Sequence, residues 1–340
     1  MKAIAVDAMG GDYAPVEIVC GALDAVRSWR IPVVLVGDET QILPLVKAAG
    51  MTNDPLVKVQ HASQVIGMDE HPGMAYRKKK DASVVVAAKL VKEGHCGALV
   101  APGSTGAAVT AGLFGLGRIK GIRRPAIATP LPTQDGGTTL LIDSGASANP
   151  GAENLLQNAL LGHVFMQRVY GIVEPRVGLL NIGTEEIKGS NVVTDVYPKM
   201  QEQSVYRFIG NVEGRDIPKR VADVVVCDGF TGNVVLKFAE GMATMMMHLL
   251  KDAVMKNGWR AKLGGWLLRP ALKQALKKVD YAEYGGAPLL GVEGGLVICH
   301  GASKARAIQN AVRLASHIAD SEMVEHIKTA LETVDATNEE

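Results

Sequence analysis

Four short turns of the chain combine glycine with hydroxyl, amide or carboxyl side chains, and each follows an apolar run. They are 7–12, 102–106, 181–189 and 228–233. Glycine allows backbone N–H groups to turn toward an anion, and serine and threonine hydroxyls add further donors. Each turn by itself is most often only a turn. Four of them at one edge of one sheet would favour an anion site of phosphate size.

Several familiar ligand and nucleophile motifs are absent. No G-x-G-x-x-G follows a predicted strand and no G-x-x-x-x-G-K-[ST] occurs, so a nucleotide cofactor is not indicated. The turn Pro102-Gly103-Ser104-Thr105-Gly106 has proline where a nucleophile elbow requires its first glycine. We therefore expect no cofactor.

The four cysteines are scattered, without a C-x-x-C pair or matching histidine spacing. This distribution predicts no structural metal site and no disulfide framework, and it is typical of a reducing cytoplasm. The one cysteine that ends a predicted strand beside a candidate turn is interpreted as a small buried hydrophobic residue. The cysteines are Cys20, Cys96, Cys227 and Cys299.

Apolar runs alternate with helical patterns along most of the 340 residues, of which 47% are hydrophobic and 21% charged. This composition excludes a disordered chain, and the alternation predicts an α/β fold with a mostly parallel sheet. We expect one compact domain over 1–335 and a frayed tail over 336–340. The predicted strands are 3–6, 33–36, 98–100, 139–142, 177–180 and 224–227. The predicted helices are 16–29, 83–92, 153–170 and 234–257.

The segment 251–280 differs from the rest because it carries eight basic residues against two acidic ones, although the whole chain has a net charge of only +1. The global charge therefore indicates no nucleic-acid partner. We predict a basic helical hairpin at about 250–282 that protrudes from the domain. Its contact residues would be Trp259, Arg260, Lys262, Trp266 and Arg269. The methionines Met242, Met245, Met246 and Met247 are interpreted as filling a core or a helix pair.

Five motifs together resemble the signatures of the bacterial phosphate acyltransferase (PlsX) family. In chain order they lie at 7–12, 180–189, 210–216, 227–233 and 285–291. The run Asp228-Gly229-Phe230-Thr231-Gly232-Asn233 is the most specific of them, and the resemblance extends from Ala3 to about Ala315. It implies a three-layer α/β/α fold similar to that of isocitrate and isopropylmalate dehydrogenases and of phosphate acetyltransferases.

The resemblance also implies an activity and partners. Family members transfer a fatty acyl group from acyl carrier protein to inorganic phosphate, and the acyl phosphate serves membrane phospholipid synthesis. They are typically homodimers. Two positions differ from the family pattern, since Ser104 and Ser147 stand where the family has asparagine. Serine keeps one donor and one acceptor but lacks the second amide donor and the reach of asparagine.

This reaction requires little acid or base help. The leaving thiol has a pKa of about 8.5 and phosphate near neutral pH is substantially dianionic, so no covalent intermediate is needed. The protein must instead gather the anions and stabilise an oxyanion. We assign Lys188 as the cation, Asn233 to the oxyanion, and Asp228 or His300 to orienting donors or managing the phosphate proton. The expected phosphate and substrate residues are Asp7, Gly10, Gly11, Asp12, Gly103, Ser104, Thr105, Gly106, Asp143, Asn181, Gly183, Gly229, Thr231 and Gly232.

Other interpretations remain open at this stage. A short-chain phosphate acyltransferase using coenzyme A would share the glycine-rich turns, and a non-catalytic membrane scaffold would share the basic hairpin. The hairpin could contact anionic lipid or a membrane acyltransferase, or it could bind the acidic surface of acyl carrier protein, or it could pack in a dimer. We expect a cytoplasmic protein that associates peripherally with the membrane.

Overall fold

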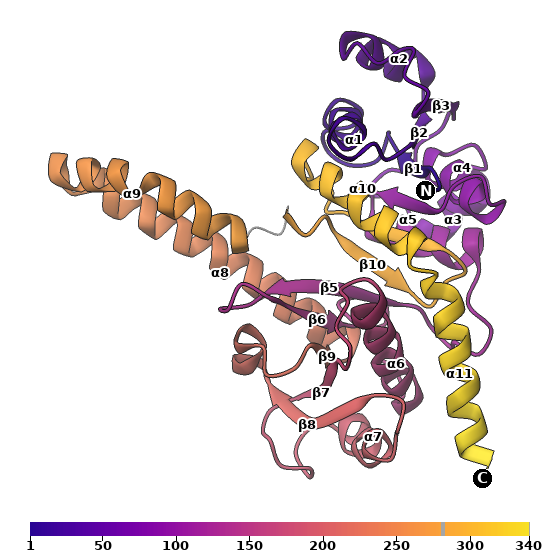
Figure 1. The fold of residues 1–340 in the computed structure, drawn as a ribbon, viewed down its shortest axis with the longest axis vertical. Helices are drawn as coiled ribbons and strands as arrows, with labels where there is room; N and C mark the ends of the chain where they lie inside the picture. The colour runs from indigo at the N-terminus through magenta and orange to yellow at the C-terminus, as the bar shows by residue number, and fades with distance from the viewer. Residues whose placement is uncertain (280–282, 340) are drawn as a thin grey trace.

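One sheet runs through the whole protein in the computed structural model, which describes residues 1–279 and 283–339. Its order is β3-β2-β1-β4-β11-β10-β5-β6-β9-β7-β8 (Figure 1). The strands are β1 (Ile4–Asp7), β2 (Val33–Gly37), β3 (Val57–His61), β4 (Ala98–Ala101), β5 (Ala126–Pro132), β6 (Thr138–Ile142), β7 (Arg176–Asn181), β8 (Arg207–Glu213), β9 (Val224–Val226), β10 (Ala287–Leu290) and β11 (Gly295–Ile298).

Parallel pairing dominates this sheet. Seven of its ten neighbouring pairs are parallel, and the three antiparallel pairs lie together at β11–β10, β10–β5 and β5–β6. The predicted α/β fold with a mostly parallel sheet is confirmed. Because these three antiparallel pairs separate β11 from β6, the strands β6, β9 and β7 run opposite to β1, β4 and β11. The expectation that all four candidate turns share one edge of the sheet is therefore wrong, and the turns of the two groups of strands approach each other across β10 and β5.

Helices connect the strands. They are α1 (Val16–Trp29), α2 (Glu39–Ala48), α3 (Pro72–Lys78), α4 (Ser83–Lys92), α5 (Thr105–Thr110), the π-helix η1 (Ala111–Leu116), α6 (Ala152–Arg168), α7 (Asn191–Gln201), the 3-10 helix η2 (Gly214–Lys219), α8 (Gly229–Lys256), α9 (Gly258–Val279), α10 (Ala305–Asp320) and α11 (Met323–Glu339). The predicted tail at 336–340 continues in α11 as far as Glu339, and the last residue lies outside the described chain.

Alternating side chains of one strand enter two separate cores, which shows that helices cover both faces of the sheet. Ile4 and Val6 of β1 belong to the core beneath α1 and α10, whereas Ala5 belongs to the core beneath α4 and α5. Every residue of β1 is buried, as expected for a parallel strand that is covered on both sides. The result is a layered α/β/α arrangement.

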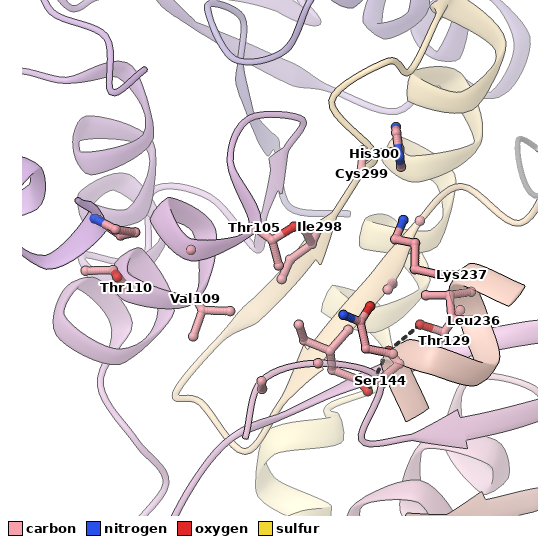
Figure 2. Close-up of a pocket in the computed structure, with 18 of the residues that line it drawn as sticks. Thr105, Val109, Thr110, Thr129, Ser144, Leu236, Lys237, Ile298, Cys299 and His300 are labelled. Atoms are coloured by element: carbon pink, nitrogen blue, oxygen red, sulfur yellow. Dashed lines mark hydrogen bonds between the residues drawn. The ribbon is translucent and has the colours of Figure 1, made fainter. Parts of the chain in front are cut away.

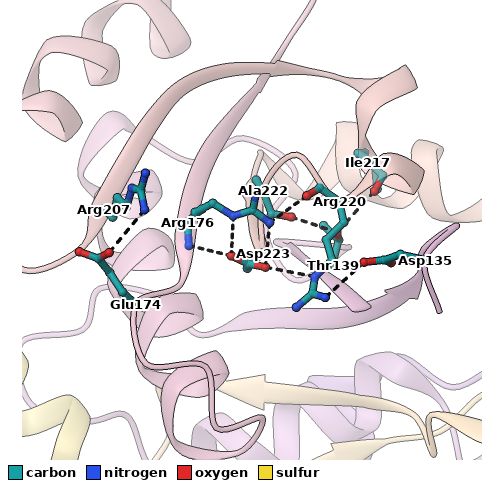
Figure 3. Close-up of polar contacts among 9 residues, drawn as sticks. All are labelled: Asp135, Thr139, Glu174, Arg176, Arg207, Ile217, Arg220, Ala222 and Asp223. Atoms are coloured by element: carbon teal, nitrogen blue, oxygen red, sulfur yellow. Dashed lines mark hydrogen bonds and ion pairs between the residues drawn. The ribbon is translucent and has the colours of Figure 1, made fainter. Parts of the chain in front are cut away.

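A group of charged residues joins the start of β7 to the start of β9 (Figure 3). The carboxylate of Asp223, which is 5% exposed, accepts a bond from Arg176 Nε at 2.9 Å and one from Arg220 Nε at 3.2 Å. Beside it, the hydroxyl of Thr139 in β6 donates to the carbonyl of Ala222 at 3.0 Å. These contacts hold the neighbouring strands β6, β9 and β7 in register at their starting ends, opposite the turns that follow β7 and β9.

The basic segment forms two antiparallel helices, α8 and α9, that project from the body (Figure 1). The first helix of this hairpin, α8, starts at Gly229 in the body of the protein, and residues 280–282 lie outside the described chain. Met242, Met245, Met246 and Met247 are 37–51% exposed, so they do not fill the core of the single chain, and that they fill a helix pair stays a prediction. Among the described helices, none has an apolar stretch long enough to span a bilayer.

Candidate active site

The loops after β1, β4 and β11 converge at one edge of the sheet. The N–H of Asp12 donates to the carbonyl of Gly301 at 2.8 Å, which joins the first loop to the third. A Cβ on Gly10 would lie 2.8 Å from a carboxylate oxygen of Asp7 and 2.9 Å from the nitrogen of Gly103. Only glycine allows this approach, so the glycines here join two loops.

Asp7 supports this convergence from beneath. Its side chain is buried and accepts a bond from the N–H of Met9 at 3.2 Å. Burial raises the pKa of Asp7, and the backbone donors of Met9 and Gly10 offset this only in part. Because Asp7 is enclosed, we assign it to holding the loop. The cavity between the loops is not lined by Asp7, Gly11 or Asp12.

A second pair of loops, after β6 and β9, meets on the other side of β10 and β5. Asp143 is buried and accepts bonds from four backbone N–H groups, those of Ile127, Gly145, Ala146 and Ser147, at 2.7–3.1 Å. It therefore shapes the loop after β6. The carbonyl of Ser147 accepts a bond from the N–H of Gly229 at 2.9 Å, which ties this loop to the start of α8.

Asp228 caps the helix that carries the specific motif. Its two carboxylate oxygens accept bonds from Thr231, one from the N–H at 2.8 Å and one from the hydroxyl at 2.6 Å. A Cβ on Gly232 would lie 1.9 Å from the carbonyl oxygen of Asp143, so α8 can begin against this loop only with glycine there. Asp228, Gly229, Thr231 and Gly232 thus position α8, and the cavity is not lined by any of them.

Between the two sets of loops lies a cavity of about 720 Å³ (Figure 2). Four predicted site residues line it, Thr105, Gly106, Asn233 and His300. Further polar lining comes from Thr129 and Ser144, whose hydroxyls are 2.6 Å apart. The apolar lining is formed by Pro72, Val109, Ile127, Pro130, Ala146, Leu236, Ala287 and Ile298.

The cavity contains one lysine that the sequence analysis did not identify. Lys237 lies one helical turn after Asn233 on α8, and its side chain extends into the space shown in Figure 2. Its Nζ donates to Oε2 of Glu240 at 2.8 Å. Lys237 is the single lysine or arginine among the lining residues, and Glu240 the single carboxylate. The i, i+4 spacing from Asn233 is the signal that could have revealed it.

Lys188, Asn181 and Gly183 form a separate loop after β7. The side chain amide of Asn181 donates to the carbonyl of Lys188 at 2.8 Å, and its Oδ1 accepts a bond from the N–H of Ile182 at 2.8 Å. The side chain of Lys188 is exposed, and none of the three residues lines the cavity. The structure therefore does not bring the predicted cation to the cavity, although its loop is adjacent in the sheet order.

The two serines that replace family asparagines have different surroundings. Ser147 is buried and its hydroxyl accepts a bond from Arg124 at 2.8 Å, whereas Ser104 is half-buried and precedes α5. Neither they nor Gly103 line the cavity, although Ser104 and Gly103 directly precede Thr105, which does.

Two cysteines near the site are unsuited to nucleophilic chemistry. Cys227 is buried, as predicted, and burial raises its pKa well above the ordinary thiol value, with the charges of Asp143 and Asp228 adding to the effect. Cys299 lines the cavity, and burial raises its pKa to about 12. Both thiols are therefore protonated at neutral pH, whereas the thiolate is the reactive form.

The remaining predicted groups have the following positions. His300 is exposed at the cavity, and its Nδ1 accepts a bond from the N–H of Ala302 at 3.1 Å. Within residues 1–279 and 283–339, no group of three histidine, cysteine, aspartate or glutamate side chains could hold a metal ion. The hairpin residues Trp259, Arg260, Lys262, Trp266 and Arg269 all lie on α9.

Known proteins match this chain over almost its whole length. Residues 2–326 match the family described as "Fatty acid synthesis protein". A relative from Heliobacterium modesticaldum, named phosphate acyltransferase, is 53% identical over 97% of this chain and 99% of its own. Another of that name from Desulfitobacterium hafniense is 50% identical over 99% of each chain.

Solved structures show the same fold at low sequence identity. A phosphotransacetylase from Streptococcus pyogenes superposes with a TM-score of 0.62 at 16% identity and covers 95% of this chain and 94% of its own. EutD phosphotransacetylase from Staphylococcus aureus has a TM-score of 0.60 at 13% identity, with 94% of each chain covered. With the near-complete match to its sequence relatives, the chain belongs to the bacterial phosphate acyltransferase (PlsX) family and is an acyltransferase that uses phosphate.

Proposed function

We propose that the protein transfers a fatty acyl group from acyl carrier protein to inorganic phosphate and releases an acyl phosphate for membrane phospholipid synthesis. The observation that supports this most is the mixed lining of the cavity. One part offers hydroxyls, an amide and the ammonium of Lys237, which suit phosphate, and another part offers aliphatic side chains, which suit an acyl chain.

In this reaction a phosphate oxygen attacks the thioester carbonyl and forms a tetrahedral oxyanion. The carbon–sulfur bond then breaks, the thiolate takes up a proton, and the new oxygen–carbon bond remains in the acyl phosphate. We assign Asn233 to the oxyanion, because its amide can donate and lies at the start of α8. Thr105, the N–H groups around Gly106 and the ammonium of Lys237 would bind phosphate.

His300 and Asp228 have distinct proposed roles. The exposed imidazole of His300 lies at the cavity, where it could exchange the phosphate proton with solvent. Asp228 acts through α8, since both of its oxygens hold the first turn of the helix that carries Asn233 and Lys237. Lys188, the cation predicted from sequence, lies outside the cavity, and its contribution to turnover stays a prediction.

The preference for a fatty acyl donor is supported by the apolar lining. Acetyl groups need little hydrophobic contact, whereas each buried methylene of a longer chain contributes about 0.8 kcal/mol. Val109, Ile127 and Ile298 supply such surface beside Thr105. A short-chain enzyme using coenzyme A is the alternative, because the solved phosphotransacetylases share this fold.

The hairpin supports two further parts of the proposal. Trp259 is 71% exposed and Trp266 is 67% exposed, next to the cations Arg260, Lys262 and Arg269. Aromatic and basic side chains together are typical of peripheral attachment to anionic lipid. We propose a homodimer in the cytoplasm that associates with the membrane through this segment.

The donor preference can be measured by thiol release. The protein is incubated with phosphate and either palmitoyl-acyl carrier protein or acetyl-coenzyme A, and free thiol is determined. We expect phosphate-dependent release from the carrier substrate and at least a hundredfold lower kcat/KM with acetyl-coenzyme A. The opposite order would favour the short-chain alternative, and lipid binding without any turnover would indicate a scaffold.

A further inference from the structure

A mixed basic and apolar surface lies beside the cavity, on and around α3. The first residues of this helix, Pro72 and Gly73, line the cavity, and a Cβ on Gly106 would meet Pro72 Cγ at 2.5 Å. The start of α3 therefore packs directly against the start of α5. We call this surface the α3 rim and define it by Met68, Met74, Arg77, Lys78, Lys80 and Phe114.

The apolar members of the α3 rim are unusually exposed. Met68 is 52% exposed, Met74 is 55% and Phe114 is 60%. Phe114 packs against the ring of Tyr76 in α3, with ring centroids 6.1 Å apart, so the exposed ring is held in place. Large side chains that are exposed together beside a cavity are typical of a protein-binding surface.

The basic members of the α3 rim are available to a partner. Arg77 and Lys78 are exposed and have no ion-pair partner within residues 1–279 and 283–339. Two neighbouring acids are already engaged, since Glu70 pairs with Lys79 Nζ at 2.5 Å and Asp81 accepts bonds from Ser63. A third, Asp69, is exposed beside Met68, which leaves the three cations of the α3 rim against one carboxylate. The α3 rim therefore presents positive charge that its own surroundings do not neutralise.

The distance to the cavity distinguishes the α3 rim from the hairpin tip as a binding surface for a carrier protein. Gly73 at the cavity and Lys78 are five residues apart on one helix, or about 8 Å. Glu240 at the cavity and Lys256 at the tip of α8 are sixteen residues apart, or about 24 Å. A carrier holds its thioester on a pantetheine arm whose backbone equals about five residues, or roughly 17 Å.

We infer that the α3 rim is the docking surface for the acidic carrier protein that delivers the acyl thioester. This inference rests on the proposed function, because it assumes a carrier donor. From the α3 rim the arm passes His71 and Pro72 and reaches the cavity, whereas from the hairpin tip it falls short by roughly 7 Å. Figure 1 shows α3 on the body of the protein and the hairpin tip far from it.

The test compares two charge reversals of equal size. Arg77→Glu/Lys78→Glu alters the α3 rim, and Arg260→Glu/Lys262→Glu alters the hairpin by the same four charges. We expect the first pair to raise KM for palmitoyl-acyl carrier protein about tenfold with little change in kcat, because opposite charges across an interface mainly affect encounter. We expect the hairpin pair to leave this KM within about twofold of wild type.

A neutral substrate controls for folding of the site. Palmitoyl-pantetheine carries the arm without the carrier, so both variants should turn it over at the wild-type rate. An unchanged KM for the carrier substrate in Arg77→Glu/Lys78→Glu, or a larger increase in the hairpin variant, would overturn the inference while the proposed function stands. Wild-type protein that uses palmitoyl-pantetheine but not the carrier substrate would overturn both.

Discussion

At the residue scale, the cavity holds one lysine and one carboxylate, and the two are paired. The side chains of Lys237 and Glu240 are 54% and 34% exposed, and an exposed pair of this kind contributes about 0–1 kcal/mol. A dianionic phosphate forms stronger charge-assisted bonds than that. Lys237 can therefore exchange its bond with Glu240 for one with phosphate at little cost.

Replacing Lys237 should weaken phosphate binding specifically. We expect Lys237→Met to raise KM for phosphate by about 10- to 100-fold, since a hydrogen bond to a charged group is worth about 1.5–3 kcal/mol. Lys237→Arg should recover part of the loss. Lys251→Met, on the exposed part of the same helix, is the matched control. A phosphate KM in Lys237→Met equal to that of the control would remove Lys237 from the site.

Lys188→Ala tests the cation that was predicted from sequence. If Lys188 serves phosphate, this variant keeps its fold and loses most of its turnover. Circular dichroism and thiol release on the same preparation would show both properties. Near-normal turnover would exclude Lys188 from the site, in agreement with its exposed position in the loop after β7.

Neither cysteine near the site should be required for turnover. Cys299, whose pKa is raised to about 12 by burial, is a protonated thiol at neutral pH. We expect Cys299→Ser and Cys227→Ser to retain activity within about fivefold of wild type, measured as thiol release. A loss of activity by a factor of a thousand in a folded variant would indicate a covalent acyl-enzyme.

At the element scale, the pairing of strands β6, β9 and β7 depends on the carboxylate of Asp223. Burial acts to raise its pKa, but the bonds from Arg176 and the charge of Arg220 hold it below the ordinary value. A carboxyl with a lowered folded-state pKa stabilises the fold above its unfolded value of about 3.9, and this contribution is lost as pH falls through the folded value. The contribution is therefore fully present at neutral pH.

Asp223→Asn should lower the free energy of unfolding by about 3–5 kcal/mol at pH 7, because two arginines lose their buried partner. Urea unfolding measures the change. Glu174→Gln is the control, since Glu174 pairs with Arg207 at 3.5 Å on the surface, and it should change stability by less than about 0.5 kcal/mol. Equal values for the two variants would contradict a structural role for Asp223.

The predicted strands and helices were those with a strong local pattern. All six predicted strands occur, because each is an apolar run that is buried on both faces of the sheet. The strands that were missed lack this signal. β3 alternates apolar and polar residues at the sheet edge, and β5 contains two prolines. β8 is interrupted by Gly210 and Asn211, and β10 and β11 are short and flanked by glycine.

The site was predictable only in part, for a related reason. Turns at strand ends indicated Thr105, Gly106 and Asn233, because ligands bind beyond the carboxyl ends of strands. That the two strands involved, β4 and β9, run in opposite directions was not predicted. Lys237 lies inside a helix, and its i, i+4 spacing from Asn233 indicates that the two share a helix face but not which surface that face meets. Thr129 and Ser144 enter the cavity through β5 and the loop after β6, and the antiparallel pairing of β5 was not predicted.

At the scale of the whole molecule, the hairpin exposes more apolar surface than a single chain normally tolerates. Five large apolar side chains of the hairpin are 51–71% exposed, namely Phe238, Met246, Leu249, Trp259 and Trp266. We expect the wild-type protein to sediment as a dimer, with twice the 35.9 kDa mass of one chain. Met246→Glu/Leu249→Glu should shift it toward monomer, and a wild-type monomer at micromolar concentration would contradict the proposed homodimer.

In the proposed reaction, inorganic phosphate takes the acyl group from a carrier thioester. The most direct measurement incubates the purified protein with palmitoyl-acyl carrier protein, with and without inorganic phosphate, and traps acyl phosphate with hydroxylamine. We predict palmitoyl hydroxamate together with an equal amount of free carrier thiol, both only when phosphate is present. Thiol release that does not depend on phosphate, or no hydroxamate at all, would contradict acyl transfer from the carrier to phosphate.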